Sequence, residues 1–177
     1  MSKQGTSEDG QRRRITLERH YRATAEDVWD LWTTKRGIES WWGPAGFAVT
    51  VQRLDLHVGG ELLYTMTATA PEQVAFMRQA GMPLATEVSV VYTEIEPMHR
   101  LGYKSLADFI PGTPSYEIVT TVSIDPEPDG VCMMLTFDAM HDEQWTERAV
   151  MGHQSELDRL DRILDADTWR RSSASPT

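Results

Sequence analysis

The feature that most constrains the fold is a long amphipathic segment at residues 142–166. Apolar and small residues recur in it at helical spacing and form one continuous stripe, made of Trp145, Ala149, Gly152, Leu157, Leu160 and Leu164. Asp142 and Glu143 stand in its first turn, where acidic side chains suit the positive end of the helix dipole. As an unbroken helix the segment extends about 36 Å. A sheet with one apolar face needs a cover, and this helix is the longest candidate.

The segments before this helix are mostly short strands. Alternating apolar residues predict a first strand at residues 12–22, followed by a helix that begins at Thr24 and a second short helix at residues 35–42. Six further strands are predicted in antiparallel arrangement, at residues 47–56, 62–66, 86–95, 100–106, 116–124 and 131–137. Strand-rich segments with helices kept to one face predict an α+β fold.

Two connections between the strands are expected to border any cavity under the sheet. Residues 69–81 predict a small helix, because Thr69 can cap its first turn and Gly81 can end it. The loop at residues 108–112 carries two large apolar residues side by side, which loops rarely do unless those residues pack on something. We expect both segments to flank the mouth of the cavity. The alternative is that Phe109 and its neighbour seal a small satellite core.

Length and charge limit the kinds of partner. The 177 residues suit one domain, expected at residues 12–167 between disordered tails at 1–11 and 168–177. The net charge of −10 argues against a general nucleic-acid binder or a protein that binds anionic membranes. No run approaches the roughly 20 apolar residues of a membrane span, and the N-terminus lacks a signal-peptide pattern. A cytoplasmic monomer or homodimer is therefore expected.

The sequence contains no recognisable catalytic or metal-binding motif. Cys132, the only cysteine, lies in an apolar run and is predicted to be a buried packing residue. The five histidines are scattered without metal-ligand spacing, so no metal site is predicted. Nucleophile elbows, phosphate loops and dinucleotide fingerprints do not occur, so no cofactor and no catalytic residue is predicted. Four polar residues that can reach a cavity are interpreted as surface or capping residues: Asp108, Arg148, His153 and Ser155.

Several short motifs follow one another in an order that resembles a known family. They are Val28-Trp29, Trp41-Trp42-Gly43-Pro44, Val58-Gly59-Gly60, Glu94-Ile95-Glu96-Pro97 followed by Arg100-Leu101, and Gly152 in the long helix. Over roughly residues 15–164 the chain resembles the SRPBCC or START-like superfamily, and within it the activator of heat shock protein 90 ATPase homologue family. The resemblance implies a helix-grip (START-like, Bet v-like) fold. In this fold a curved antiparallel sheet wraps around the C-terminal helix, and two short helices follow the first strand.

The resemblance also implies a deep apolar cavity between the sheet and the long helix. The chain has six tryptophans and nine methionines, and these side chains make adaptable apolar surfaces. Gly152 is expected to leave space beneath the sheet. The predicted ligand-binding residues are Trp32, Trp41, Trp42, Tyr64, Met66, Tyr103, Phe109, Met133, Phe137, Trp145, Met151 and Gly152.

Three functions are compatible with this resemblance. The leading hypothesis is a protein that binds a small hydrophobic molecule and has no evident catalytic activity. The alternatives are stimulation of a heat shock protein 90 ATPase, with that chaperone as partner, and an enzyme of the polyketide cyclase or dehydratase kind. A binding protein would show a closed apolar cavity and a co-chaperone a large exposed patch. A cyclase would show two or more polar groups converging inside the pocket.

Overall fold

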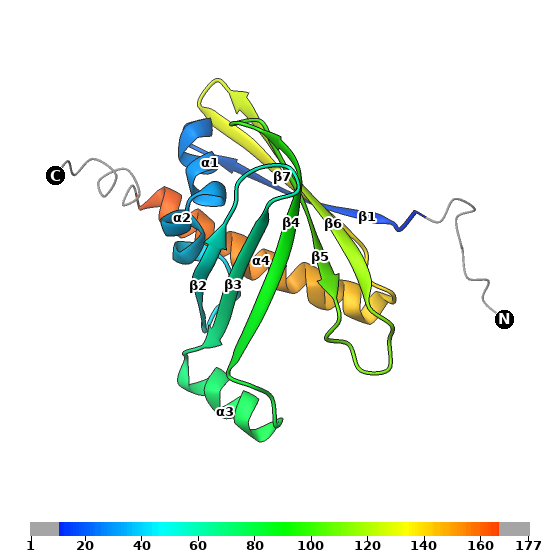
Figure 1. The fold of residues 1–177 in the computed structure, drawn as a ribbon. Helices are drawn as coiled ribbons and strands as arrows, with labels where there is room; N and C mark the ends of the chain where they lie inside the picture. The colour runs from blue at the N-terminus through cyan, green and yellow to red at the C-terminus, as the bar shows by residue number, and fades with distance from the viewer. Residues whose placement is uncertain (1–10, 167–177) are drawn as a thin grey trace.

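The computed structural model describes residues 11–166 and shows a curved sheet packed against one long helix (Figure 1). In chain order the elements are β1 (Arg14–Tyr21), α1 (Ala25–Thr33), α2 (Lys35–Trp41), β2 (Phe47–Leu54), β3 (Glu61–Ala68), α3 (Pro71–Gln79), β4 (Ala85–Glu96), β5 (Arg100–Ala107), β6 (Tyr116–Glu127), β7 (Gly130–Asp138) and α4 (Glu143–Asp165). The predicted α+β, helix-grip fold is confirmed. The tails predicted at 1–11 and 168–177 lie, apart from residue 11, outside the described residues.

The sheet has seven strands in the order β1-β7-β6-β5-β4-β3-β2, and every neighbouring pair is antiparallel. Strands β2 to β7 each lie beside their sequence neighbours, and only the β3–β4 connection contains a helix, α3. Strand β1 instead pairs with β7, from Arg14 opposite Asp138 to Tyr21 opposite Val131. This pairing places the first strand of the domain beside the last.

The C-terminal half of α4 fixes the long helix to the rest of the domain. Leu157 and Leu160 are fully buried in the main hydrophobic core. Between them the half-buried Arg159 side chain reaches across to the segment between α2 and β2. Its Nη1 atom donates hydrogen bonds to the carbonyl oxygens of Gly43 at 2.8 Å and of Phe47 at 3.1 Å. Burial lowers the pKa of Arg159, and these carbonyl contacts satisfy the buried cation.

Three tryptophans fill the space between α1, α2 and the sheet. The ring centroids of Trp32 and Trp41 are 4.6 Å apart, and that of Trp42 lies 5.3 Å and 5.4 Å from them. Trp32 Nε1 donates to the sulfur of Met133, and Trp41 Nε1 donates to the carbonyl of Leu31. Because the buried ring N–H groups have partners, this cluster forms a solid part of the core.

Two local expectations were wrong. Thr69 does not cap α3, because its hydroxyl donates to the carbonyl of Gly46 instead. Cys132 is only partly buried: Val131 and Met133, its neighbours in β7, face the core, so Cys132 points to the opposite face of the sheet. Within residues 11–166, no helix combines the length and apolar content needed to cross a membrane.

Replacing Arg159 by methionine is expected to lower the free energy of unfolding by about 2 kcal/mol, because the carbonyl oxygens of Gly43, Pro44 and Phe47 lose a charged donor. Urea unfolding followed by circular dichroism measures this change. Arg162→Met is the matched control, since Arg162 is exposed one turn later in the same helix. It is expected to lie within about 0.5 kcal/mol of the parent. Equal losses in the two variants would contradict a specific role for the Arg159 hydrogen bonds.

Candidate functional site

A cavity of about 720 Å³ lies between the sheet and the N-terminal half of α4. This volume falls within the range of small-molecule sites. The cavity arises because the residues of α4 that face the sheet are fully buried in the C-terminal half of the helix but only partly buried in its N-terminal half. Leu157 and Leu160 are fully buried, whereas Ala149 and His153, earlier in the helix, are only partly buried and line the cavity. A straight helix therefore meets the curved sheet closely at one end and leaves space at the other.

Most of the cavity wall is apolar and comes from the sheet. Strands β2 to β7 all contribute residues to it. Besides the predicted residues, the apolar lining includes Phe47, Leu63, Val88, Val90, Ile118 and Met140. The wall is thus a continuous surface assembled from segments that are distant in the sequence.

The structure places half of the predicted ligand-binding residues in this wall: Trp42, Tyr64, Met66, Tyr103, Phe109 and Phe137. Three others, Trp32, Trp41 and Met133, are almost completely buried in the core and do not line the cavity, so their predicted place was wrong. The reason is geometric. Trp41 and Trp42 are adjacent residues at the end of α2, and only Trp42 points from the aromatic cluster toward the cavity.

The remaining three predicted residues, all on α4, also lie outside the lining. Met151 is 68% exposed, because it follows Ala149 by two residues and therefore faces about 200° away around the helix. A Cβ atom added at Gly152 would meet nothing within 4 Å, so this glycine borders open space and not the cavity wall. Trp145 packs beside a satellite core that includes Ile110, with its ring 5.9 Å from that of Phe109.

The mouth of the cavity is formed by the β5–β6 loop and the α3 region. Asp108 and Phe109 line the cavity from the loop, and Met77 and Met82 line it from α3 and the segment after it. Phe109 is 62% exposed and Met82 is half exposed, so both reach solvent at the rim. The expectation that these two segments border the cavity is confirmed. Ile110, the neighbour of Phe109, is buried in the satellite core, so the alternative is also partly correct.

A small polar group lies on the helix side of the cavity. Nδ1 of His153 and Oε2 of Glu156 are 3.1 Å apart, at hydrogen-bond distance. The imidazole ring rests 4.4 Å from the ring of Phe137. Across the cavity, burial and then the nearby charge of Glu156 raise the pKa of both Tyr64 and Tyr103. The two phenols therefore remain protonated and can act as hydrogen-bond donors.

The charged residues that line the cavity are acidic. They are Glu87, Asp108 and Glu156, and among the described lining residues there is no lysine or arginine. Asp108 and His153, interpreted from sequence as surface residues, thus belong to the cavity. Arg148 and Ser155 do not, since the Arg148 guanidinium lies over the Trp145 ring and the Ser155 hydroxyl accepts a hydrogen bond from the backbone of Ala45.

Several lining residues were missed by the sequence analysis. On α4 the signal was present, because Ala149, His153, Glu156 and Leu160 follow one another at spacings of four, three and four residues. This row is the side of the helix that faces the sheet. For α3 the sequence analysis placed the helix at the cavity mouth but did not single out Met77 or Met82, because only the fold brings α3 to the end of the sheet away from α1 (Figure 1).

Comparisons with known proteins identify the fold and the family. The family model described as Activator of Hsp90 ATPase homolog 1-like protein matches residues 22–165. A solved structure from Chromobacterium violaceum has a TM-score of 0.70 and 23% identity, and the match covers 85% of this chain and 96% of that one. The AHSA1 protein from Silicibacter pomeroyi has a TM-score of 0.67 and 20% identity, with 88% and 99% covered.

A protein from Arthrobacter aurescens has a TM-score of 0.69 and 22% identity, with 88% and 87% of the two chains covered. At these identities the structures show a shared fold alone. No protein with a curated description matches the chain. The family model, by contrast, spans most of the sequence and both the sheet and the long helix. The chain therefore belongs to the family of Activator of Hsp90 ATPase homolog 1-like proteins.

Proposed function

We propose that this protein binds a small, mainly apolar molecule between the sheet and α4. The observation that carries the proposal is the cavity of about 720 Å³ with its largely apolar wall. Burial of apolar ligand surface contributes about 25 cal/mol per Å². Part of this gain is lost when the ligand and the β5–β6 loop become ordered. Modest affinity for flat or elongated apolar molecules is the expected result.

The charge of the lining further limits the class of ligand. Glu156 lies on the helix side of the cavity and Asp108 at the loop, and no lining residue among those described is a lysine or arginine. An anionic headgroup placed there would meet like charge at low dielectric. The His153–Glu156 pair and the protonated phenols offer hydrogen bonds to one polar group. The ligand class that fits is a neutral or cationic apolar molecule with a single hydrogen-bonding end.

Filling the cavity from α4 is expected to weaken binding. In Ala149→Leu the larger side chain would occupy space that Ala149 now leaves open, so the affinity for the neutral dye Nile red is expected to fall about fivefold to thirtyfold, equivalent to about 1–2 kcal/mol. Gly152→Leu is the matched control on the same helix and is expected to bind the dye like the parent. A fluorescence titration of the three proteins measures the affinities.

The outcomes of this titration separate the possible sites. Equal weakening in both variants would contradict the cavity as the binding site, because Gly152 does not line it. The absence of dye binding by the parent protein would contradict the proposal as a whole. Thermal unfolding of each variant confirms that the comparison is made between folded proteins.

Replacing Glu156 by glutamine is expected to reverse the preference of the cavity for cationic over anionic ligands. The parent should bind decylamine more tightly than decanoate when each competes with Nile red. Glu156→Gln should weaken decylamine and strengthen decanoate, each by about fivefold to tenfold, since about 1 kcal/mol changes an affinity by this factor. Glu147→Gln is the control, because Glu147 is exposed on the same helix. The same shift in both variants would assign the preference to overall charge.

Proton-transfer catalysis is a second candidate function, favoured by the convergence of His153 and Glu156 inside the cavity. A ligand that is recovered chemically altered from the parent protein, but unaltered from His153→Gln, would support it.

The co-chaperone alternative is favoured by the exposed apolar side chains near the mouth, Phe76, Met82, Leu106 and Phe109. The ATPase rate of a heat shock protein 90, measured with the parent and with Phe109→Ser, tests that role.

A further inference from the structure

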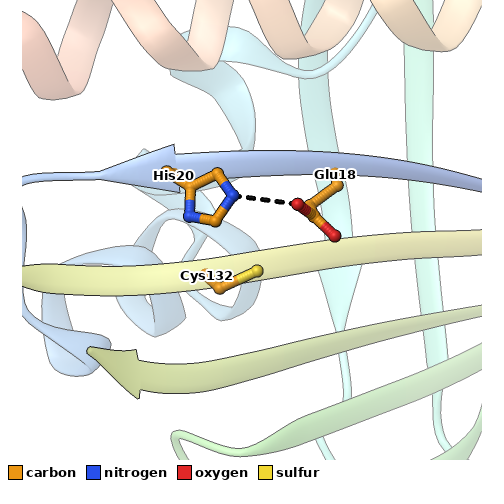
Figure 2. A group of neighbouring side chains, drawn as sticks. All are labelled: Glu18, His20 and Cys132. Atoms are coloured by element: carbon orange, nitrogen blue, oxygen red, sulfur yellow. Dashed lines mark hydrogen bonds and ion pairs between the residues drawn. The ribbon is translucent and has the colours of Figure 1, made fainter.

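Three potential metal ligands of different chemistry meet on the outer face of the sheet, away from the cavity. Glu18 and His20 extend from β1, and Cys132 extends from β7 directly opposite His20. One ligand atom from each residue lies within 4.8 Å of the other two. Figure 2 shows the imidazole, the carboxylate and the thiol directed toward a common space between the two strands.

The hydrogen bonds of His20 give each ring nitrogen a separate role. Nε2 faces the cluster and lies 2.9 Å from Oε1 of Glu18. Nδ1 faces the other way and lies 3.1 Å from the carboxylate of Glu127, on β6. Metal-bound histidines commonly donate their second ring N–H to a carboxylate, which fixes the tautomer and orients the ring. Glu127 stands in the position of this outer carboxylate.

We propose that Glu18, His20 and Cys132 bind one zinc ion, with Glu127 as the residue that positions the imidazole. Thiolate, imidazole and carboxylate are the donors that zinc takes in proteins, and a water molecule completes the four ligands. Calcium and magnesium select oxygen donors and do not fit this set. When zinc binds, the Cys132 thiol transfers its proton to solvent, and zinc replaces the hydrogen bond between His20 and Glu18.

The charge around the cluster favours a cation. Asp125, on β6, pairs with Cys132. Glu18 lies on β1, and Glu127 lies at the end of β6 beside the turn to β7. An ordinary surface ion pair explains the contacts of His20 with the two glutamates, but it leaves the thiol among carboxylates with no interaction that favours it there. A dication contacts all three ligand atoms at once and offsets their mutual repulsion. The side chains of Glu18 and His20 are more than half exposed, so metal ions can reach the site from solvent.

The sequence patterns predict no metal site at these residues. Glu18 and His20 are far from Cys132 in the sequence, so no spacing rule detects the cluster. The pairing of β1 with β7 alone brings them together, and the alternation of side chains places all three on one face. None of the three ligands lines the cavity, and their strand neighbours Arg19, Tyr21 and Met133 lie on the opposite face of the sheet.

Cobalt(II) serves as the spectroscopic probe, because a thiolate bound to it gives a charge-transfer absorption band that oxygen and nitrogen ligands do not give. The reduced full-length chain, freed of metal by chelation, is titrated with cobalt and then with zinc. The expected result is one equivalent of cobalt with a thiolate band, which zinc abolishes by displacement. Zinc is also expected to protect Cys132, the only thiol of the chain, from a thiol-alkylating reagent.

Variants assign the ligands. Cys132→Ser is expected to lose the thiolate band, and His20→Gln and Glu18→Gln are each expected to weaken zinc binding at least about tenfold. Glu127→Gln is expected to weaken it less than His20→Gln does. His57→Gln is the matched control, because His57 is an exposed histidine outside the cluster. It is expected to bind zinc like the parent.

Either of two results would overturn the proposal. The first is no thiolate band in the parent protein at equimolar cobalt. The second is a band that persists unchanged in both His20→Gln and Glu18→Gln, which would mean that the thiol binds metal without its neighbours. Circular dichroism of each variant verifies the fold. All the substituted residues are on the outer face or at turns, so loss of folding is not expected.

Discussion

The burial of Leu157 and Leu160 against the tryptophan-rich core is the interaction on which the rest of the structure depends. It fixes the C-terminal half of α4 to α1, α2 and the sheet, and Arg159 adds hydrogen bonds to the segment before β2. The helix has no break, so its other half must extend in the direction that this anchor sets. The sheet curves, and the gap between the two becomes the cavity. The solid core thus lies where the C-terminal half of α4 packs on the sheet, and the cavity lies where the N-terminal half does not.

The cavity has a rigid side and an adaptable side. Trp42 belongs to both the core and the lining: its Nε1 atom donates to the hydroxyl of Tyr64 at 3.3 Å, and its ring lies 5.8 Å from that of Tyr103. Aromatic groups held in this way lose little freedom when a ligand binds. Around the mouth the lining comes instead from Met77, Met82 and the β5–β6 loop. Methionine side chains adjust to different shapes, so this is the adaptable side of the cavity.

The two faces of the sheet carry separate chemistry because a strand alternates its side chains. On β7, Met133 is buried in the core, while the adjacent Cys132 lies on the outer face with His20 and Glu18. A shift of one residue in the pairing of β1 with β7 would move these groups to the wrong face. The register is held by the apolar residues of the inner face. The same burial that builds the core therefore also positions the polar cluster outside.

The sequence by itself determined the order and type of the elements, because periodicity and capping are local. The stripe that includes Ala149, Leu157 and Leu160 marked the side of α4 that packs on the core, and α1 begins after Thr24 as predicted. Only the tertiary structure decided which buried aromatic residues border a cavity. Trp41 and Trp42 are neighbours in the chain with the same chemistry, but only Trp42 lines the cavity. The meeting of His20 with Cys132 was likewise decided by the pairing of the first strand with the last, because strand pairing depends on contacts between distant segments and local patterns do not record it.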